Sequence, residues 1–375
     1  MFHPFDVEQF LSELEHGVSY NFSESGVHPM TLRELAEMTG LDLEAFMDTL
    51  LDYPQVNGFA LLRERIASLY AGAGAANVMV TVGATEANTL VANTLLAPGD
   101  SMVAFRPIYE QLTGNARNRG VTVRYVEMDP FNSWRIDGAA VAAAVDETTK
   151  VVHVINPNNP TGRVLDDAER AAIVSSAQKV GAWIVSDEVY AGTERDTDVT
   201  TRSFWGDYDK VMVLNSMSKA YGLPGLRLGW LVGPEPEITA AWRRHEYAAV
   251  AASTLSMKLA EAVLEEPGRS AIVARARSLI RTGFETLTEA LAVHPGVFSV
   301  TPPQASAMSF VRFDLPVGSD ALARRLHAEK DVLVIPGDKF HVEKHFRFSS
   351  ALPEAYLREG LRRLNQMVAE ILSQA

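Results

Sequence analysis

Between about residues 78 and 233, short β-rich runs alternate with segments of helical periodicity. After the first run, apolar residues recur at helical spacing from Ala87 to Leu95, and Pro98-Gly99-Asp100 then stops the helix. Such alternation predicts an α/β fold in which helices cover a mainly parallel sheet. The runs that we expect to form a seven-stranded central sheet are 78–83, 101–105, 121–128, 151–155, 183–186, 211–214 and 227–232.

The last hundred residues have a different character. A long helical pattern runs from 271 to about 293, and a terminal helix is expected from Pro353. Between them lie the strand-like runs 307–313, 332–335 and 346–348. We therefore expect a large domain over residues 49–270 and a small α+β domain built from residues 1–48 together with 271–375. No internal repeat or linker divides the chain into independent modules.

Composition excludes several classes of function. The chain has no cysteine, so disulfides, thiolate nucleophiles and cysteine-ligated metal sites are ruled out. A formal charge of −13 argues against nucleic-acid binding, because phosphate backbones are bound by clustered Lys and Arg. The N-terminus lacks the pattern of a signal peptide, and no apolar run is long enough to span a bilayer. We expect a cytoplasmic protein without a membrane partner.

The strongest chemical signal is the segment Ser216-Met-Ser-Lys-Ala-Tyr-Gly-Leu-Pro-Gly-Leu-Arg-Leu-Gly-Trp230. It places Lys219 just after a predicted buried strand, where an amine is well placed to form an imine with a carbonyl cofactor. Ser216, Ser218 and Arg227 can supply hydroxyl and guanidinium donors to a phosphate. The alternative is a surface loop whose polar residues occur by chance.

This segment resembles the active-site lysine region of class I/II aminotransferases, the fold type I family of pyridoxal-phosphate enzymes. Further motifs of the family follow in the expected order across nearly the whole chain. The resemblance implies the fold type I architecture and an enzyme that binds pyridoxal 5′-phosphate, with Lys219 as the catalytic residue that holds the cofactor as a Schiff base. It implies small amino-acid substrates and no metal ion.

Two strand ends are expected to bind the cofactor ring. Asp187 and Tyr190 lie in Ser-Asp-Glu-Val-Tyr, after a buried strand, and Asn159 lies in Asn-Pro-Asn-Asn-Pro-Thr-Gly, after another. By resemblance, Asp187 pairs with the pyridine nitrogen, while Tyr190 and Asn159 bind the ring oxygen. A nearby carboxylate keeps the nitrogen protonated, so that the ring can accept electrons from the substrate. Taken alone, the Asn/Pro/Gly string would be read as a turn.

Three further matches concern the phosphate and the ring face. Gly83, Ala84 and Thr85 open a helix, whose unpaired N–H groups favour an anion, and the resemblance assigns them to the cofactor phosphate. Tyr109 matches the aromatic residue that stacks on the ring, although in isolation it would be read as a core tyrosine. Tyr53 matches the tyrosine that reaches a phosphate in the neighbouring subunit. A homodimer with shared active sites is therefore implied.

Near the C-terminus, the segment His345-Phe-Arg-Phe-Ser-Ser-Ala resembles the family's segment around the arginine that binds the substrate α-carboxylate. Arg347 fits this role, because a planar guanidinium can hold a carboxylate with two parallel hydrogen bonds. Without the family pattern, an exposed strand arginine is the alternative.

The N-terminal segment suggests the reaction. The stretch Ser23-Glu-Ser-Gly-Val-His is similar to the Ser-Ser-Gly-Val-His segment of the capreomycidine synthase group of hydroxyarginine cyclases, and implies that Ser25, Gly26 and His28 bind the substrate. Those enzymes also carry a glutamate upstream of the glycine, and Glu8 stands eighteen residues before Gly26. A carboxylate there can hold a guanidinium through paired hydrogen bonds. The alternative is that Glu8 is a solvated helix residue and His28 a loop histidine.

We therefore hypothesise the elimination and cyclisation of β- or γ-hydroxyarginine to a cyclic guanidino amino acid such as capreomycidine or enduracididine. The sequence does not indicate which carbon bears the leaving hydroxyl. Two alternatives stay open: an amino-acid aminotransferase that uses a 2-oxo acid, and a ligand-sensing domain like that of certain transcription regulators. The second would require an attached basic DNA-binding domain, for which the family motifs leave no room before them.

Overall fold

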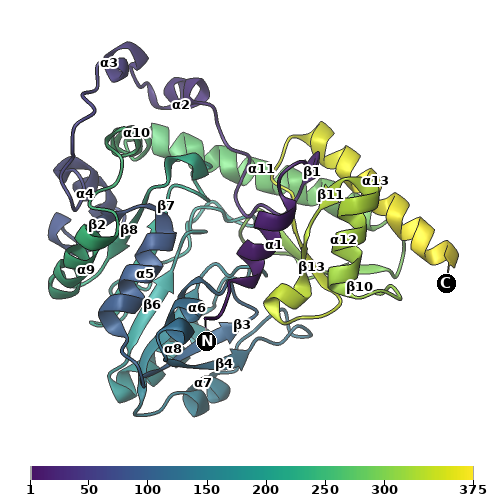
Figure 1. Ribbon diagram of the computed structural model, residues 1–375, viewed down its shortest axis with the longest axis horizontal. Helices are drawn as coiled ribbons and strands as arrows, with labels where there is room; N and C mark the ends of the chain where they lie inside the picture. The colour runs from purple at the N-terminus through teal and green to yellow at the C-terminus, as the bar shows by residue number, and fades with distance from the viewer. Residues whose placement is uncertain (1, 375) are drawn as a thin grey trace.

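A seven-stranded sheet forms the centre of the larger part of the molecule in the computed structural model, which describes residues 2–374 (Figure 1). Strand β8 runs antiparallel to both of its neighbours, and the other pairs are parallel. The predicted α/β fold is confirmed. In spatial order the strands are β2 (Val78–Thr81), β8 (Gly229–Val232), β7 (Val211–Ser216), β6 (Trp183–Asp187), β5 (Thr149–Ile155), β3 (Ser101–Arg106) and β4 (Thr122–Glu127).

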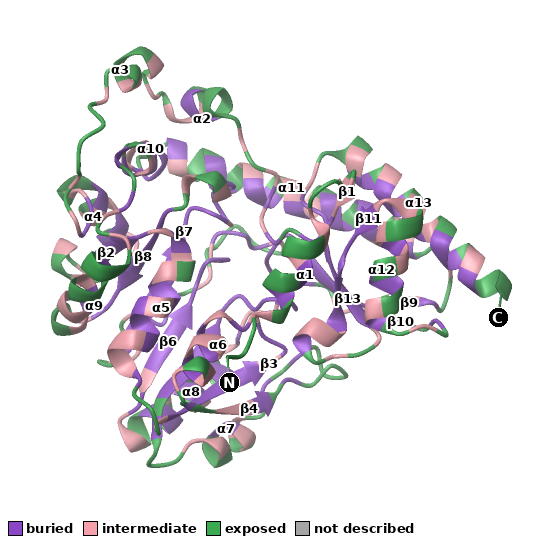
Figure 2. Cartoon of the chain, viewed as in Figure 1, coloured by how far each residue is buried: buried purple, intermediate pink, exposed green. Residues whose placement is uncertain are grey.

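Helices cover both faces of this sheet, which is why its central strands are apolar on both sides. On β5, Val151 packs toward the helices of one face, and Val152 belongs to the core of the other face. Figure 2 shows the strands buried and the outer surfaces of the helices exposed. The covering helices are α5 (Gly83–Leu95), α6 (Gln111–Asn118) and α9 (Glu235–Ala248) on one face, and α7 (Gly138–Ala144) and α8 (Asp167–Val180) on the other.

The smaller part is built around a four-stranded antiparallel sheet in the order β12-β13-β10-β9. The helices α11 (Gly268–Leu291), α12 (Ser319–Lys330) and α13 (Glu354–Gln374) pack with it. The division into domains at residues 48/49 and 270/271 stays a prediction. The strands of this part are β9 (Phe298–Val300), β10 (Met308–Phe313), β12 (Ile335–Pro336) and β13 (His345–Ser349), and a separate parallel pair joins β1 (Tyr20–Asn21) to β11 (Val332–Leu333).

Two predicted strands differ from the structure. The run 332–335 is not one strand, because Val332 pairs with Tyr20 whereas Ile335 pairs with Arg347 in another sheet. The strand expected from Arg227 begins at Gly229, since Arg227 adopts a left-handed conformation with φ of 47°. Neither the division of 332–335 nor the later start at Gly229 changes the hydrophobic pattern, so neither could be predicted from the sequence.

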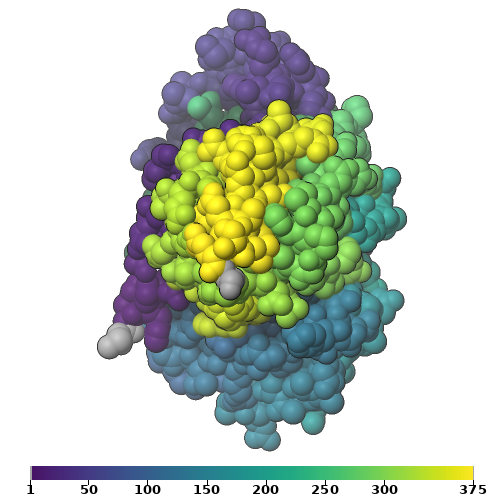
Figure 3. All heavy atoms as spheres, turned by 90° about the vertical axis from the view of Figure 1, so that its right-hand side faces the viewer, coloured from purple at the N-terminus to yellow at the C-terminus, as the bar shows by residue number. Residues whose placement is uncertain are grey.

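The N-terminal region lies against both parts of the molecule. Helix α1 (Asp6–Leu14) lies between the two parts, with Val7 and Phe10 buried on one face (Figure 1). Helix α2 (Leu32–Thr39) packs against α11, and α3 (Leu43–Met47) projects beyond it; Figure 3 shows this region from a second direction. The remaining helices are α4 (Ala60–Ala67) and α10 (Thr254–Val263). No helix within residues 2–374 has the length and apolarity needed to cross a bilayer.

Phe22 fixes the segment that follows β1. Its ring is fully buried, stacks on Phe348 with centroids 4.4 Å apart, and packs against Gly360 of α13, where a Cβ would lie 2.1 Å from the ring. Its backbone N–H donates to the carbonyl of Leu333 at 2.9 Å, and its carbonyl accepts from the N–H of Ser349 at 2.9 Å. Phe22 therefore ties the residues after it to β13.

We expect Phe22→Ala to lower the free energy of unfolding by about 3–5 kcal/mol, because it removes a buried aromatic ring and leaves a cavity. Chemical denaturation measures this loss. The matched control is Phe131→Ala, since Phe131 is 91% exposed and its ring contributes little to the core. Equal unfolding free energies for the two variants would contradict the role assigned to Phe22.

Candidate active site

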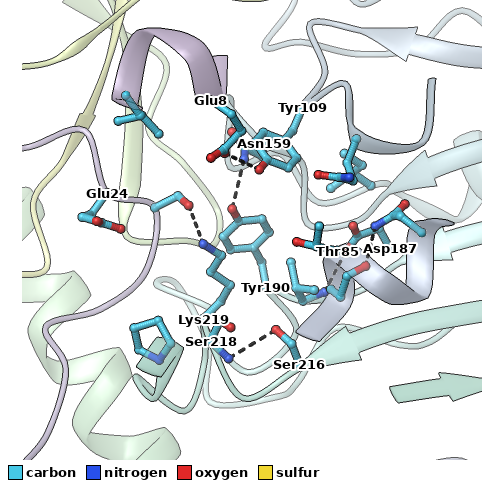
Figure 4. A pocket seen from close by; sticks show the side chains of 18 of the residues that line it. Glu8, Glu24, Thr85, Tyr109, Asn159, Asp187, Tyr190, Ser216, Ser218 and Lys219 are labelled. Atoms are coloured by element: carbon cyan, nitrogen blue, oxygen red, sulfur yellow. Dashed lines mark hydrogen bonds between the residues drawn. The ribbon is translucent and has the colours of Figure 1, made fainter. Parts of the chain in front are cut away.

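A cavity of about 310 Å³ lies at the carboxyl ends of β5, β6 and β7, where open α/β sheets bind ligands (Figure 4). The start of α5, one face of α1, strand β13 and the loop after β1 complete its wall. The predicted site residues that line it are Glu8, Ser25, Ala84, Thr85, Tyr109, Asn159, Asp187, Tyr190, Ser216, Ser218, Lys219, Arg227 and Arg347.

Two predicted glycines lie beside the cavity and not in its wall. Gly83 has φ of 72°, and a Cβ there would lie 2.6 Å from Nη2 of Arg227. A Cβ at Gly26 would lie 3.0 Å from the carbonyl oxygen of Ser218. Both positions therefore allow a close approach between segments, Gly83 toward the Arg227 guanidinium and Gly26 toward the backbone beside Lys219.

Two other predicted residues do not line the cavity. The backbone N–H of His28 donates to Ala351 at 2.9 Å, and its carbonyl accepts from Arg275 at 3.0 Å. Partial burial, together with Arg275, lowers the pKa of the His28 imidazole. Tyr53 is 89% exposed in the segment between α3 and α4. Its role in a neighbouring subunit stays a prediction.

Lys219 points its amine into the cavity, where Nζ donates to Oγ of Ser25 at 2.7 Å. Burial lowers the pKa of this amine, and the positive charge of Arg347 lowers it further, whereas Glu24 opposes the shift. A lowered pKa increases the neutral fraction of an amine, which is the form that attacks a carbonyl carbon.

Asp187, at the end of β6, is 6% exposed. Burial raises the pKa of its carboxyl to about 6, and the two hydrogen bonds that partly offset this shift come from neutral donors, the backbone N–H of Val189 at 3.2 Å and the Asn88 side chain. A buried carboxylate of this kind gains most from a cation brought to it. A protonated ring nitrogen is such a partner.

Arg347 is a buried cation whose hydrogen-bond partners are neutral. Its Nη1 donates to Oδ1 of Asn159 at 3.0 Å and its Nη2 donates to the carbonyl of Ser23 at 2.5 Å. The amide of Asn159 donates in turn to the Tyr190 hydroxyl at 3.0 Å, and burial raises the pKa of Tyr190 to about 12. Since neutral acceptors leave its charge uncompensated, Arg347 is suited to bind a carboxylate.

The start of α5 and Arg227 form an electropositive wall. Ala84 and Thr85 lie in the first turn of the helix, whose free N–H groups carry partial positive charge. The guanidinium of Arg227 lies against Gly83, and its Nη1 donates to the carbonyl of Pro224 at 3.0 Å. This arrangement suits a phosphate group.

Helix α1 closes the opposite side. Tyr109 donates its hydroxyl to Oε1 of Glu8 at 2.5 Å, and its ring lies 4.8 Å from that of Phe5 (Figure 4). Burial and the Glu8 carboxylate raise the pKa of Tyr109 well above its usual value. Glu8 shares its face of α1 with Leu11, and Glu15 follows directly after the helix. The tyrosine therefore fixes the orientation of Glu8.

Sequence reasoning missed several residues of the wall. Asn88 lies one turn into the helix that Gly83 opens, and Glu24 lies inside the Ser23-Glu-Ser motif. The position of Asn88 within a predicted cofactor-binding helix could have indicated it. The other lining residues outside our prediction are Leu11, Glu15, Ser23, Gln111, Ile155, Val189 and Pro224.

Comparison of the sequence with known families gives a match to aminotransferase class I and II over residues 21–364. Capreomycidine synthase of Streptomyces vinaceus is 28% identical over 363 residues, which cover 96% of this chain and 92% of the relative. The arginine–pyruvate transaminase of Pseudomonas aeruginosa is 30% identical, with 89% of this chain and 87% of the relative covered.

Solved structures agree with this assignment. A PLP-dependent aminotransferase from Streptococcus suis superposes with a TM-score of 0.93 at 29% identity, covering 99% of this chain and 98% of that one. The PLP-dependent cyclase OrfR superposes with a TM-score of 0.89 at 26% identity, covering 100% and 98%. The predicted cofactor, pyridoxal phosphate, is confirmed, and the anionic and cationic groups around the cavity fit it.

The raised pKa of Asp187 has a measurable consequence for the cofactor-free protein. In the folded chain the pKa of this carboxyl is about 6, whereas the ordinary pKa of an aspartate is 3.8. The contribution of this group to the stability of the folded chain is therefore fully present below about pH 4, and it is lost as the pH rises through 6.

We expect cofactor-free Asp187→Asn to be more stable than the cofactor-free parent at pH 8, by on the order of 1–3 kcal/mol. The difference should shrink as the pH is lowered through 6 toward 4, because Asp187 then becomes neutral as well. Denaturant unfolding of both proteins across this range measures it. A difference that does not change with pH would contradict the assigned pKa.

Proposed function

The chain belongs to the class I and II aminotransferase family and is a pyridoxal-phosphate-dependent enzyme, and from this premise we propose that it eliminates water from a hydroxylated L-arginine and closes a cyclic guanidine. The product would be an amino acid such as capreomycidine or enduracididine. The observation that carries the proposal is the Glu8 carboxylate, which Tyr109 holds in the same cavity as Lys219 and Arg347.

The position of Glu8 matches what a guanidinium substrate requires. An amino acid in this cavity can present its carboxylate to Arg347 and its α-carbon to Lys219. Since Tyr109 occupies one lone pair of Oε1, the carboxylate of Glu8 keeps acceptor positions on both oxygens for a planar cation. The 28% identity with capreomycidine synthase, in an alignment that covers 96% of this chain, supports a product of the same class.

Each side chain then has a defined task. When bound, pyridoxal phosphate supplies an electron-accepting ring that stabilises negative charge on the substrate α-carbon. Lys219 Nζ removes the proton from that carbon, as its lowered pKa allows. Asp187 is the carboxylate for the ring nitrogen, Arg347 binds the substrate carboxylate, and Glu8 orients the guanidinium for attack.

The bonds balance without an external oxidant. The proton of the α-carbon and the hydroxyl leave together as water. A guanidinium nitrogen then forms the new carbon–nitrogen bond of the ring, and the proton that it loses is returned to the α-carbon. No keto acid is consumed, and all nitrogen atoms of the substrate are retained. His28 does not line the cavity, so the proposal gives it no part in ring closure.

An arginine aminotransferase is the second candidate. The 30% identity with the arginine–pyruvate transaminase favours it, and the same cavity would hold arginine in the same orientation. In that case Lys219 moves the α-proton without loss of a hydroxyl, and a 2-oxo acid accepts the amino group.

We also propose a homodimer in which Tyr53 reaches the phosphate site of the neighbouring subunit. The segment that carries Tyr53 exposes several large apolar side chains, which favours burial against another chain. They are Met47 (80% exposed), Leu50 (73%), Leu51 (76%) and Tyr53 (89%).

The reaction is tested by supplying β-hydroxyarginine and γ-hydroxyarginine separately, without a keto acid. We expect one of them to give a product that has lost the mass of one water and kept every nitrogen. Arginine with pyruvate serves as the parallel reaction for the aminotransferase alternative. Deamination that depends on the keto acid, with no dehydrated product from either hydroxyarginine, would refute the cyclase.

We expect Glu8→Gln to raise KM for the guanidinium substrate about tenfold or more, because a charge-assisted pair of hydrogen bonds is lost. The absorbance spectrum of the bound cofactor should stay the same. Glu13→Gln is the matched control, since Glu13 lies on the same helix but outside the cavity. An unchanged KM in Glu8→Gln would remove Glu8 from substrate binding.

A further inference from the structure

The three residues Ser23, Glu24 and Ser25 form a loop that is fixed at both ends. Ser23 is fully buried, and its carbonyl accepts from Nη2 of Arg347 at 2.5 Å. Ser25 is 9% exposed, and its hydroxyl accepts from Nζ of Lys219 at 2.7 Å. Because both neighbours are held, the backbone of Glu24 has a defined position beside the two cations of the site.

The carboxylate of Glu24 has no ion-pair partner within the described residues. Its side chain is exposed to the cavity, and within residues 2–374 it makes no hydrogen bond or ion pair. It lines the same cavity as Lys219, and its negative charge opposes the lowering of the pKa of that amine. Yet Lys219 is needed by the cofactor and Arg347 by the substrate carboxylate. Neither cation is therefore free to neutralise Glu24 once the site is filled.

Glu24 and Glu8 reach the cavity from different elements. Glu24 comes from the loop after β1 and Glu8 from α1, and both lie around the amine of Lys219 (Figure 4). A guanidinium has five N–H donors on more than one edge, so one carboxylate cannot satisfy all of them. A second carboxylate from another direction can bind the edge that the first leaves free, whereas a compact ammonium has no second planar edge to present.

We propose that Glu24 is a specificity-determining residue, which binds the second edge of the substrate guanidinium while Glu8 binds the first. This inference rests on the proposed function only in that the substrate carries a guanidinium group. It holds equally for a cyclase of hydroxyarginine and for an arginine aminotransferase. Glu24 then makes the site select arginine derivatives over lysine and over neutral isosteres.

The test is a binding titration of the holoenzyme, followed by the absorbance of the cofactor, with L-arginine, L-citrulline and L-lysine. Citrulline has nearly the shape of arginine but no charge, and lysine has the charge without the planar group. We expect Glu24→Gln to weaken arginine binding about tenfold and to change citrulline and lysine binding less than about threefold. Glu37→Gln, on the exposed surface of α2, is the control for the loss of one negative charge.

Equally weakened binding of all three ligands would overturn the proposal, because it would show that Glu24 acts by positioning the loop or Lys219. Equal weakening of arginine and lysine alone would also overturn it, since that result requires only a general electrostatic effect. Unchanged arginine binding would exclude any contact. Failure of the cyclase proposal is seen separately, in the product assay, and leaves this titration valid for arginine.

Discussion

The buried guanidinium of Arg347 is the constraint on which the arrangement of the site depends. A charge that is removed from water must be satisfied by hydrogen bonds, and Arg347 finds them on two other segments of the chain. Its partners are Asn159, which follows β5, and the carbonyl of Ser23, which follows β1. One side chain of the smaller part thus fixes the larger sheet and the N-terminal segment relative to each other.

Burial also sets the chemistry of the charged groups. The same enclosure lowers the pKa of Lys219 and raises that of Asp187 to about 6, so that both groups are nearer to neutrality than they would be in water. Each shift leaves the group in need of a bound partner, a carbonyl carbon for the amine and a cation for the carboxylate. The empty site is therefore less favourable for the folded chain than the filled one.

Much of this could be predicted from the sequence, because it depends on local pattern. Strands buried on both faces give continuous apolar runs, and Asp187 and Lys219 follow such runs at the carboxyl end of the sheet. The division of 332–335 between two sheets depends on pairing with Tyr20 and Arg347, which no local pattern shows. Likewise, Glu24 lines the cavity and His28 does not, because of packing against residues that are distant in the sequence.

The N-terminal segment and the central sheet contribute different groups to the site. The carboxylates proposed to bind the guanidinium, Glu8 and Glu24, lie within the first 24 residues, whereas Asp187 ends β6 and Lys219 follows β7 of the central sheet. On this proposal, recognition of the guanidinium and chemistry at the α-carbon are encoded in separate stretches of sequence. A change within this short leading stretch would then alter which side chain the site accepts, without replacing the residues that act at the α-carbon.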